Sequence, residues 1–215
     1  MNPYRTLVCG LMVCMAVLGM QAQPIGVEQV NNYAKQQYKS QWKNAAMGIM
    51  PILPLDEQGG YTYSATIAMP NRSAGEVYDK MHAKLSAALD LDTILEEDRQ
   101  QGILRARTYI YSVSNQVGGF FRFHLCLHPI ITIRAIDNEA QVSISLQYYE
   151  IVKTDKGVVQ TLFKRGEGTP LPAEQWLLAD RYPYNERGKM PLATAEAYTK
   201  SYALIQLLIE QLRRK

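Results

Sequence analysis

The chain has 215 residues, of which 47% are hydrophobic and 20% are charged, and its formal net charge is +3. A charge this close to neutral argues against general nucleic-acid binding, which usually requires a strongly basic domain. Two of the three cysteines, Cys9 and Cys14, lie near the N-terminus, so the remaining chain holds only Cys126. Without an internal disulfide, that part must derive its stability from a packed core.

The first 22 residues have the three-part layout of a secretory signal peptide. Arg5 is followed by the apolar run Thr6–Met20, which is too short to span a bilayer, and Ala22 precedes the expected cleavage point. We therefore expect residues 1–22 to be removed, the protein to be exported to the periplasm or cell envelope, and the mature chain to have no transmembrane segment. An uncleaved anchor and a lipid-modified Cys14 are the alternatives.

Residues 23–60 are expected to form an N-terminal helix and a connector. Within Gly26–Met47, apolar residues recur at helical spacing, at Val27, Val30, Ala34, Tyr38 and Trp42. Met50–Gly60 contains two prolines and ends in a glycine pair, which is typical of a connecting segment.

The next segment predicts a strand, a capped helix and a hairpin. Tyr61–Met69 alternates as a strand does, and Ser73 and Glu76 are spaced as a capping box at a helix start. The helix has an apolar stripe, at Val77, Met81, Leu85 and Leu89. Asp92–Glu97 and Gly102–Val113 then flank a polar turn and predict a hairpin.

Two further strands show the clearest alternation. Phe120–Ile136 is apolar at every odd position, and its phase continues across Pro129, which predicts one long strand. Gln141–Val152 should return with Val142, Ile144, Leu146 and Tyr148 on one face and Ser143, Ser145, Gln147 and Tyr149 on the other. A sheet with such strands has one packed and one hydrated face.

The C-terminal part combines an irregular segment and a strong helix. Residues 153–189 are rich in glycine and proline, with a short helix expected at Ala173–Ala179. Thr194–Arg213 has a broad apolar face, with Leu207 on the opposite side and nearly exposed. We therefore predict one α+β domain over residues 61–215, of order β-α-β-β-β-β-α, with an antiparallel sheet and the C-terminal helix packed on one face.

Tyr61–Val152 resembles a family of uncharacterised cell-envelope proteins from Bacteroidetes-type bacteria, catalogued as a domain of unknown function with a TBP-like fold. The resemblance rests on Ile67-Ala68-Met69-Pro70, on the capped helix from Ser73 with Glu76-Val77-Tyr78, and on the strands that follow. It implies a TBP-like fold and an envelope location, and it brings no catalytic residues. The related helix-grip architecture clamps apolar ligands between the sheet and the C-terminal helix.

The hydrated face of the sheet is the candidate binding surface. The strand phases gather polar and aromatic side chains there, at Arg105, Arg107, Tyr109, Arg122, His124, His128 and Arg134. Arginine and tyrosine form binding surfaces through forked hydrogen bonds and flat rings. The alternatives are a face that is merely solvated, or one that residues 153–189 or 26–47 cover.

His124, Cys126 and His128 also raise the question of metal binding or nucleophilic catalysis. Ligands at i and i+2 of a strand lie about 7 Å apart, but the outer pair is too distant to share a metal, and the neighbouring strands offer poor zinc ligands. No phosphate loop, dinucleotide fingerprint, nucleophile elbow or paired CxxC is present. We therefore expect no metal, no cofactor and no catalytic residue.

These observations favour a non-enzymatic cell-envelope protein that binds through its polar sheet face. Its partner would be an anionic envelope glycan, a lipid head group or an acidic protein, and not nucleic acid. The first alternative is a helix-grip carrier of a small apolar ligand held between the sheet and the C-terminal helix. The second is a hydrolase or metalloprotein of unrecognised type.

Overall fold

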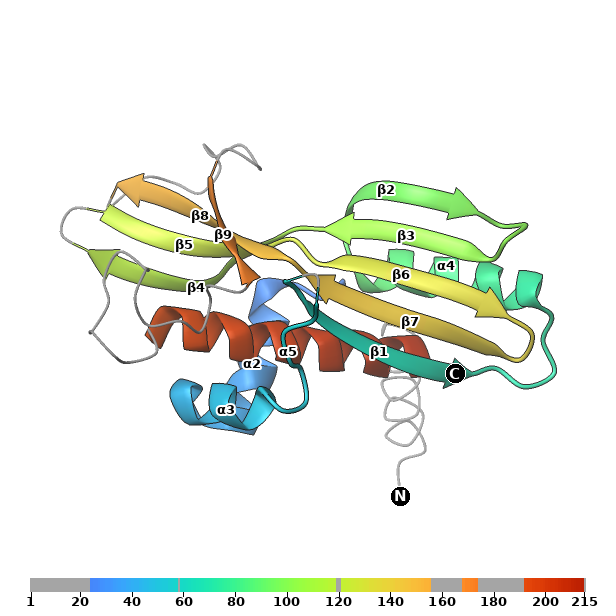
Figure 1. Cartoon of the computed structure of the whole chain (residues 1–215), viewed down its shortest axis with the longest axis horizontal. Coiled ribbons are helices and arrows are strands. Elements are labelled where there is room, and N and C mark those ends of the chain that lie inside the picture. Colours follow the sequence, from blue (N-terminus) through green and yellow to red (C-terminus); the bar gives the residue numbers. More distant parts are fainter. Residues whose placement is uncertain (1–23, 58, 119–120, 156–167, 174–191, 215) are drawn as a thin grey trace, which may run out of the picture.

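The computed structural model describes residues 24–57, 59–118, 121–155, 168–173 and 192–214. In this part of the chain, two helices precede β1, one helix separates β1 from β2, and the strands β2 to β9 then lead to the C-terminal helix (Figure 1). Their bounds are α2 Val27–Tyr38, α3 Trp42–Ile49, β1 Tyr61–Ala68, α4 Ala74–Ala88, β2 Leu91–Asp98, β3 Ile103–Thr108, β4 Ile110–Gly118, β5 Phe121–Leu127, β6 Ile130–Ile136, β7 Glu139–Leu146, β8 Tyr148–Asp155, β9 Thr169–Pro172 and α5 Leu192–Arg213. The predicted signal peptide and the predicted helix at 173–179 lie outside the described residues, except for Ala173.

The strands form two antiparallel sheets that lie end to end (Figure 1). The large sheet has the order β1-β7-β6-β3-β2, and the small sheet has the order β4-β5-β8-β9. Three stretches of chain pass from one sheet to the other, at Tyr109, at His128-Pro129 and at Gln147. The predicted α+β class, with antiparallel pairing and a C-terminal helix, is confirmed.

The predicted long strand Phe120–Ile136 is divided into β5 and β6. Pro129 has no N–H to donate to a ladder, and its carbonyl accepts from the Thr108 amide at 3.2 Å. The phase nevertheless holds across the break, because Leu127 and Ile131 are both fully buried. The sequence pattern therefore predicted the facing of these residues correctly and missed only the division between sheets.

The strand predicted at Gln141–Val152 is also divided, and the expected phase holds for Val142, Ile144 and Leu146 but not beyond Gln147. Leu146 and Tyr149 are both fully buried, so the alternation slips by one residue at Gln147. Tyr149 was expected on the polar face beside Ser143, but its hydroxyl lies 2.8 Å from the Ser201 hydroxyl of α5. Tyr148 takes the outward position instead, because the chain changes sheets at this point.

Two helices cover the inner faces of the sheets. Helix α4 packs on β3, β6 and β7, and it begins with the predicted capping box, in which the Ser73 and Glu76 side chains bind each other's backbone amides. Helix α5 packs on β1, β4 and β5. Figure 1 shows α5 running beneath both sheets, so it joins the two halves of the described fold.

The N-terminal residues form two helices rather than the one that was predicted. The chain bends at Lys39 and Ser40, whose φ angles of 48° and 58° end α2. Both α2 and α3 pack against α5, and α2 also contacts β4. Leu207 was expected to be nearly exposed, but it is partly buried and packs against the core.

The contact between α5 and the sheets is filled with side chains. Leu204, Ile205 and Leu208 of α5 are at most 2% exposed. A water-sized void beside these side chains would leave accessible area on them, so the carrier alternative gains no support at these positions. No helix within the described residues is long and apolar enough to cross a membrane.

Candidate binding face

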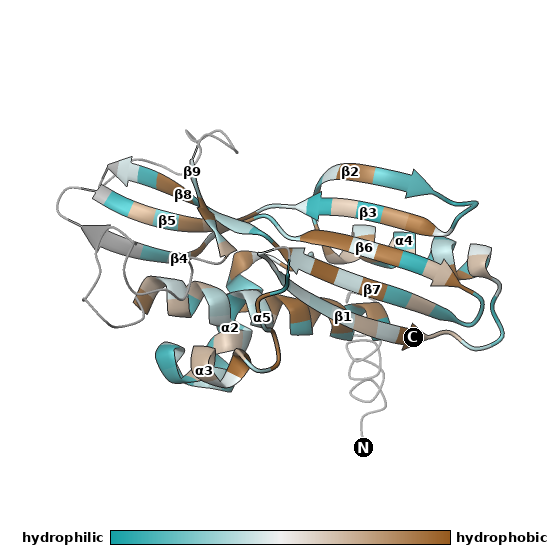
Figure 2. Cartoon of the chain, viewed as in Figure 1, coloured by the Kyte–Doolittle hydropathy of each residue, from teal (hydrophilic) through white to brown (hydrophobic). Residues whose placement is uncertain are grey.

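The outer face of the large sheet carries rows of polar side chains. Residues that oppose each other on neighbouring antiparallel strands point to the same side of a sheet. The register therefore aligns one row across five strands, consisting of Glu96, Arg105, Thr132, Ser143 and Ser64. A second row runs beside it, consisting of Arg134, Gln141 and Thr66. The strand alternation thus assembles a hydroxyl-rich surface that contains two arginines. Figure 2 shows hydrophilic and hydrophobic residues interleaved along β6 and β7.

This face is hollowed where the two rows meet β1, β6 and β7. The hollow has a volume of about 400 Å³. Its lining consists of Ser64, Ala65, Thr66, Thr132, Arg134, Gln141, Val142 and Ser143. None of these residues carries a carboxylate, so the hollow offers hydroxyls, an amide and one guanidinium to a ligand. We call this feature the sheet hollow.

The predicted arginines differ in how free their charges are. Arg105 and Arg134 are exposed, and Arg105 lies directly across the ladder from Thr132 of the sheet hollow. Arg107 is half-buried, with its Nε 3.5 Å from a carboxylate oxygen of Asp92. Asp92 therefore partly neutralises Arg107, whereas no described carboxylate forms an ion pair with Arg105 or Arg134.

Arg122 belongs to a different part of the molecule. It is exposed on β5 of the small sheet, where it lies opposite Val117 and Thr154. The sequence placed Arg122 and Arg134 on one strand face, and their phases agree. The break at His128-Pro129 puts them in separate sheets, so the sheet hollow includes only Arg134.

His124 and His128 were expected on the hydrated face, and the structure corrects this, because each is only 8% exposed. His124 hydrogen bonds through Nδ1 to the Ser112 hydroxyl at 2.8 Å and through Nε2 to the Thr154 hydroxyl at 3.1 Å. Burial lowers the pKa of His124 below its usual value, assisted by the positive charge of Arg122. His124 is therefore a neutral ring held in a polar part of the core.

His128 forms the most deeply buried ionisable contact of this region. Its Nε2 lies 2.8 Å from a carboxylate oxygen of Glu150, which is only 2% exposed. The other Glu150 oxygen accepts the Gly168 amide at 2.6 Å. Glu150 thus connects β8 to the neighbouring β5 and to the chain that leads into β9.

Tyrosine rings cover these histidines. The ring of Tyr111 lies 5.1 Å from that of His124, and the rings of Tyr109 and Tyr148 lie 4.8 Å and 5.2 Å from that of His128. Tyr109, one of the predicted binding residues, is half-buried. Burial raises its pKa, as does its contact with Cys126. The Tyr109 side chain therefore packs over His128 and contacts the buried thiol of Cys126.

Cys126 completes the cluster as a free, fully buried thiol. Ser112 adopts a φ of 52° in a bulge of β4, and its amide lies 3.5 Å from the Cys126 sulfur. Burial raises the pKa of the thiol above its usual value, so it stays protonated at neutral pH. A protonated, inaccessible thiol is inert, since the thiolate is the reactive form.

The geometry of this cluster is that of a polar core. Within the part of the chain that the structure describes, no group of three or more His, Cys, Asp or Glu side chains is arranged to hold a metal ion. Sequence reasoning missed Ser112 and Glu150, which supply the main hydrogen bonds. The sequence signal for Glu150 was an acidic residue within a predicted strand. Its position directly opposite Cys126 is evident only from the observed register.

The similarity of this α+β chain to known proteins is confined to solved structures. No family model matches the chain, and no curated protein matches it. It is similar to a solved DUF4468 family protein from Bacteroides ovatus, at 17% identity and a TM-score of 0.43, over 74% of this chain and 90% of that one. It is also similar to a TBP-like protein from Parabacteroides distasonis, at 13% identity and a TM-score of 0.46, over 75% of this chain and 97% of that one.

Proposed function

We propose that this protein is a non-enzymatic, exported binding protein that takes an acidic glycan on the outer face of its large sheet. The observation that carries the proposal is the sheet hollow, where exposed Arg134 stands among hydroxyl and amide side chains. Sugar hydroxyls exchange hydrogen bonds with serine, threonine and glutamine. A sugar carboxylate fits the forked donors of an arginine.

Arg105 extends the proposed site along the first polar row. It lies across from Thr132, so a chain of sugars passing over the hollow would meet a second guanidinium. A glycan with repeated acidic units can contact both guanidinium groups at once, whereas a single small anion can contact only one. The export part of the proposal rests on the signal-like residues 1–22. An exported protein would meet envelope polysaccharide.

The test is binding of polygalacturonate, an acidic glycan, with neutral dextran as the comparison. We expect the protein to bind polygalacturonate and not dextran, and binding should weaken as salt rises because exposed charges are screened. The double variant Arg105→Gln/Arg134→Gln should bind about tenfold more weakly or worse, by loss of two charge-assisted contacts. Calorimetric titration of each glycan measures both effects.

The matched control is Lys35→Gln/Lys39→Gln, which removes the same charge from exposed positions at the end of α2. This control should bind polygalacturonate as the unchanged protein does. Equal loss of binding in both double variants would show that only net charge matters and would overturn the proposed site. Binding of dextran as tight as that of polygalacturonate would also overturn it.

A further inference from the structure

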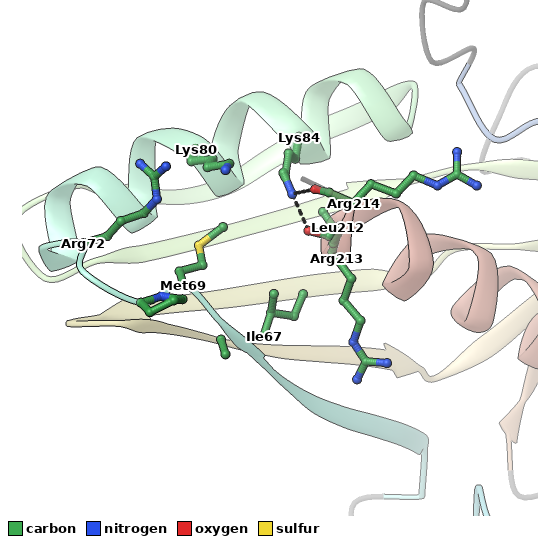
Figure 3. Close-up of a pocket in the computed structure, with 10 residues that line it drawn as sticks. Ile67, Met69, Arg72, Lys80, Lys84, Leu212, Arg213 and Arg214 are labelled. Carbon is green, nitrogen blue, oxygen red and sulfur yellow. Dashed lines mark hydrogen bonds between the residues drawn. The ribbon is translucent and has the colours of Figure 1, made fainter.

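A second hollow lies where the end of α5 meets α4 and the end of β1 (Figure 3). Its volume is about 220 Å³. The apolar part of the lining includes Ile67, Met69 and Leu212. The charged part is entirely basic and consists of Arg72, Lys80, Lys84, Arg213 and Arg214. We call this feature the basic pocket.

The basic side chains come from three separate parts of the fold. Arg72 follows β1, Lys80 and Lys84 lie on α4, and Arg213 and Arg214 end α5. Lys80 and Lys84 are four residues apart, a spacing at which like charges destabilise a helix. Folding therefore places five basic residues around one hollow in spite of their mutual repulsion, although the Arg214 side chain points away from it (Figure 3).

Described carboxylates relieve this repulsion only in part, through the attraction between Glu76 on α4 and Arg72. No ion pair between any of the five groups and an acidic side chain is found within the described residues. Burial and the positive charges of Lys80 and Arg72 lower the pKa of Lys84 below its usual value. An anion in the pocket would offset the repulsion, so the pocket has an electrostatic reason to be occupied.

Lys84 also holds the pocket together. Its ammonium group donates to the backbone carbonyls of Leu212, at 2.7 Å, and of Arg214. These carbonyls belong to the C-terminal end of α5, where a positive charge is favourable. Figure 3 shows Lys84 reaching from α4 to this helix end. Lys84 is thus a positioning residue that keeps the last turn of α5 beside α4.

The lining combines cations with apolar carbon, which defines the ligand chemistry. Arginine binds phosphate through two parallel hydrogen bonds, and lysine supplies a point charge. We propose that the basic pocket binds a phosphate ester, with the phosphate at Arg72 and Lys80 and the attached carbons against Ile67 and Met69. Such an ester is either a free phosphorylated metabolite or the head group of an anionic phospholipid.

The experiment titrates the full chain with glycerol 3-phosphate and, separately, with vesicles of phosphatidylcholine containing phosphatidylglycerol. Saturable binding of glycerol 3-phosphate identifies a free phosphate ester, and binding only to the vesicles identifies a lipid head group. Either result supports the proposal if binding is weakened by substitutions in the basic pocket. The double variant Arg72→Gln/Lys80→Gln should then bind the active probe about tenfold more weakly or worse.

The control is Arg105→Gln/Arg134→Gln, which carries the same charge change on the outer face of the large sheet. It should keep the phosphate binding and lose the glycan binding, whereas Arg72→Gln/Lys80→Gln should do the reverse. The two proposals therefore fail separately. Absence of binding to both probes at low salt overturns the basic pocket, and so does an equal loss in both double variants. Lys84→Gln is avoided, because it removes the contact between α4 and α5.

Discussion

The most sensitive single residue in the described core is Glu150. Its carboxylate is buried and accepts from both the His128 ring and the Gly168 amide. Removing one member of a buried, hydrogen-bonded pair leaves the other groups without a partner, which costs roughly 3–5 kcal/mol. We expect Glu150→Ala to lower the free energy of unfolding by about this amount, as measured by denaturant titration.

Two variants calibrate that expectation. Glu150→Gln keeps the size of the side chain and an oxygen acceptor, so it should destabilise less than Glu150→Ala. Glu57→Ala removes an exposed carboxylate and should change the free energy of unfolding by less than about 0.5 kcal/mol. A Glu150→Ala protein as stable as the Glu57→Ala protein would show that the His128 contact contributes nothing.

At this scale the sequence could predict direction but not exposure. Alternation on β5 and β6 correctly placed His124 and Arg134 on one face, because a strand turns its side chains to opposite sides with a period of two. It could not show that the face is open at Arg134 and closed at His124. The ring that closes it at His124, Tyr111, comes from β4, and tertiary packing alone brings it over the histidine.

At the scale of elements, Gly102, directly before β3, is a position with no room for a side chain. Its φ is +70°, and an added Cβ would overlap the carbonyl oxygen of Ala135 on β6. The same two residues share a ladder hydrogen bond, from the Ala135 amide to the Gly102 carbonyl, at 2.7 Å. An alanine here is strained whatever the space, because side chains disfavour a positive φ.

Gly102→Ala is therefore expected to lower the free energy of unfolding by about 1–3 kcal/mol. The matched variant is Gly48→Ala in α3, where an added Cβ meets nothing within 4 Å. That change should stabilise by up to about 1 kcal/mol, because alanine favours the helix more than glycine does. Thermal unfolding of the two proteins side by side measures the contrast. Midpoints that move in the same direction would contradict this account of the β2–β3 turn.

The element boundaries show where local patterns stop being informative. The capping box at Ser73 and the β2–β3 hairpin were predictable, because short-range chemistry determines both. The passage from one sheet to the other was not, since the apolar alternation continues unchanged through Pro129. Nor was the slip at Gln147, where a single extra residue reverses the facing of Tyr148 and Tyr149.

At the scale of the whole molecule, buried tyrosines connect the two sheets through α5. Tyr149 of the small sheet hydrogen bonds to Ser201 of α5, and Tyr61 of the large sheet packs its ring 5.0 Å from that of Tyr198 on the same helix. The sequence identified α5 as a strong helix, but not as the element shared by both sheets. That role depends on Tyr149 facing inward, which the strand pattern did not reveal.

These tyrosines predict a fold that loses stability in alkaline solution. Burial raises the pKa of Tyr61 from 10.0 to about 12, and it raises that of Tyr149 well above 10.0. As the pH passes 10, the unfolded chain loses phenolic protons that the folded protein retains, so the free energy of unfolding must fall. The contribution of these groups is fully present below pH 10 and decreases as the pH rises towards 12.

The measurement is the denaturant midpoint at a series of pH values from neutral to 12, followed by circular dichroism, with tyrosinate absorbance recorded on the same samples. We expect the midpoint to fall above pH 10 and the tyrosinate signal of the buried rings to appear together with unfolding.

Tyr149→Phe removes one of these protons, so its midpoint should fall less steeply with pH. At neutral pH this variant should be less stable by about 1 kcal/mol, from loss of the hydrogen bond to Ser201. A midpoint that stays constant between pH 10 and 12, or an equal slope for both proteins, would mean that ionisation of these tyrosines is not coupled to the packing of α5 against the two sheets.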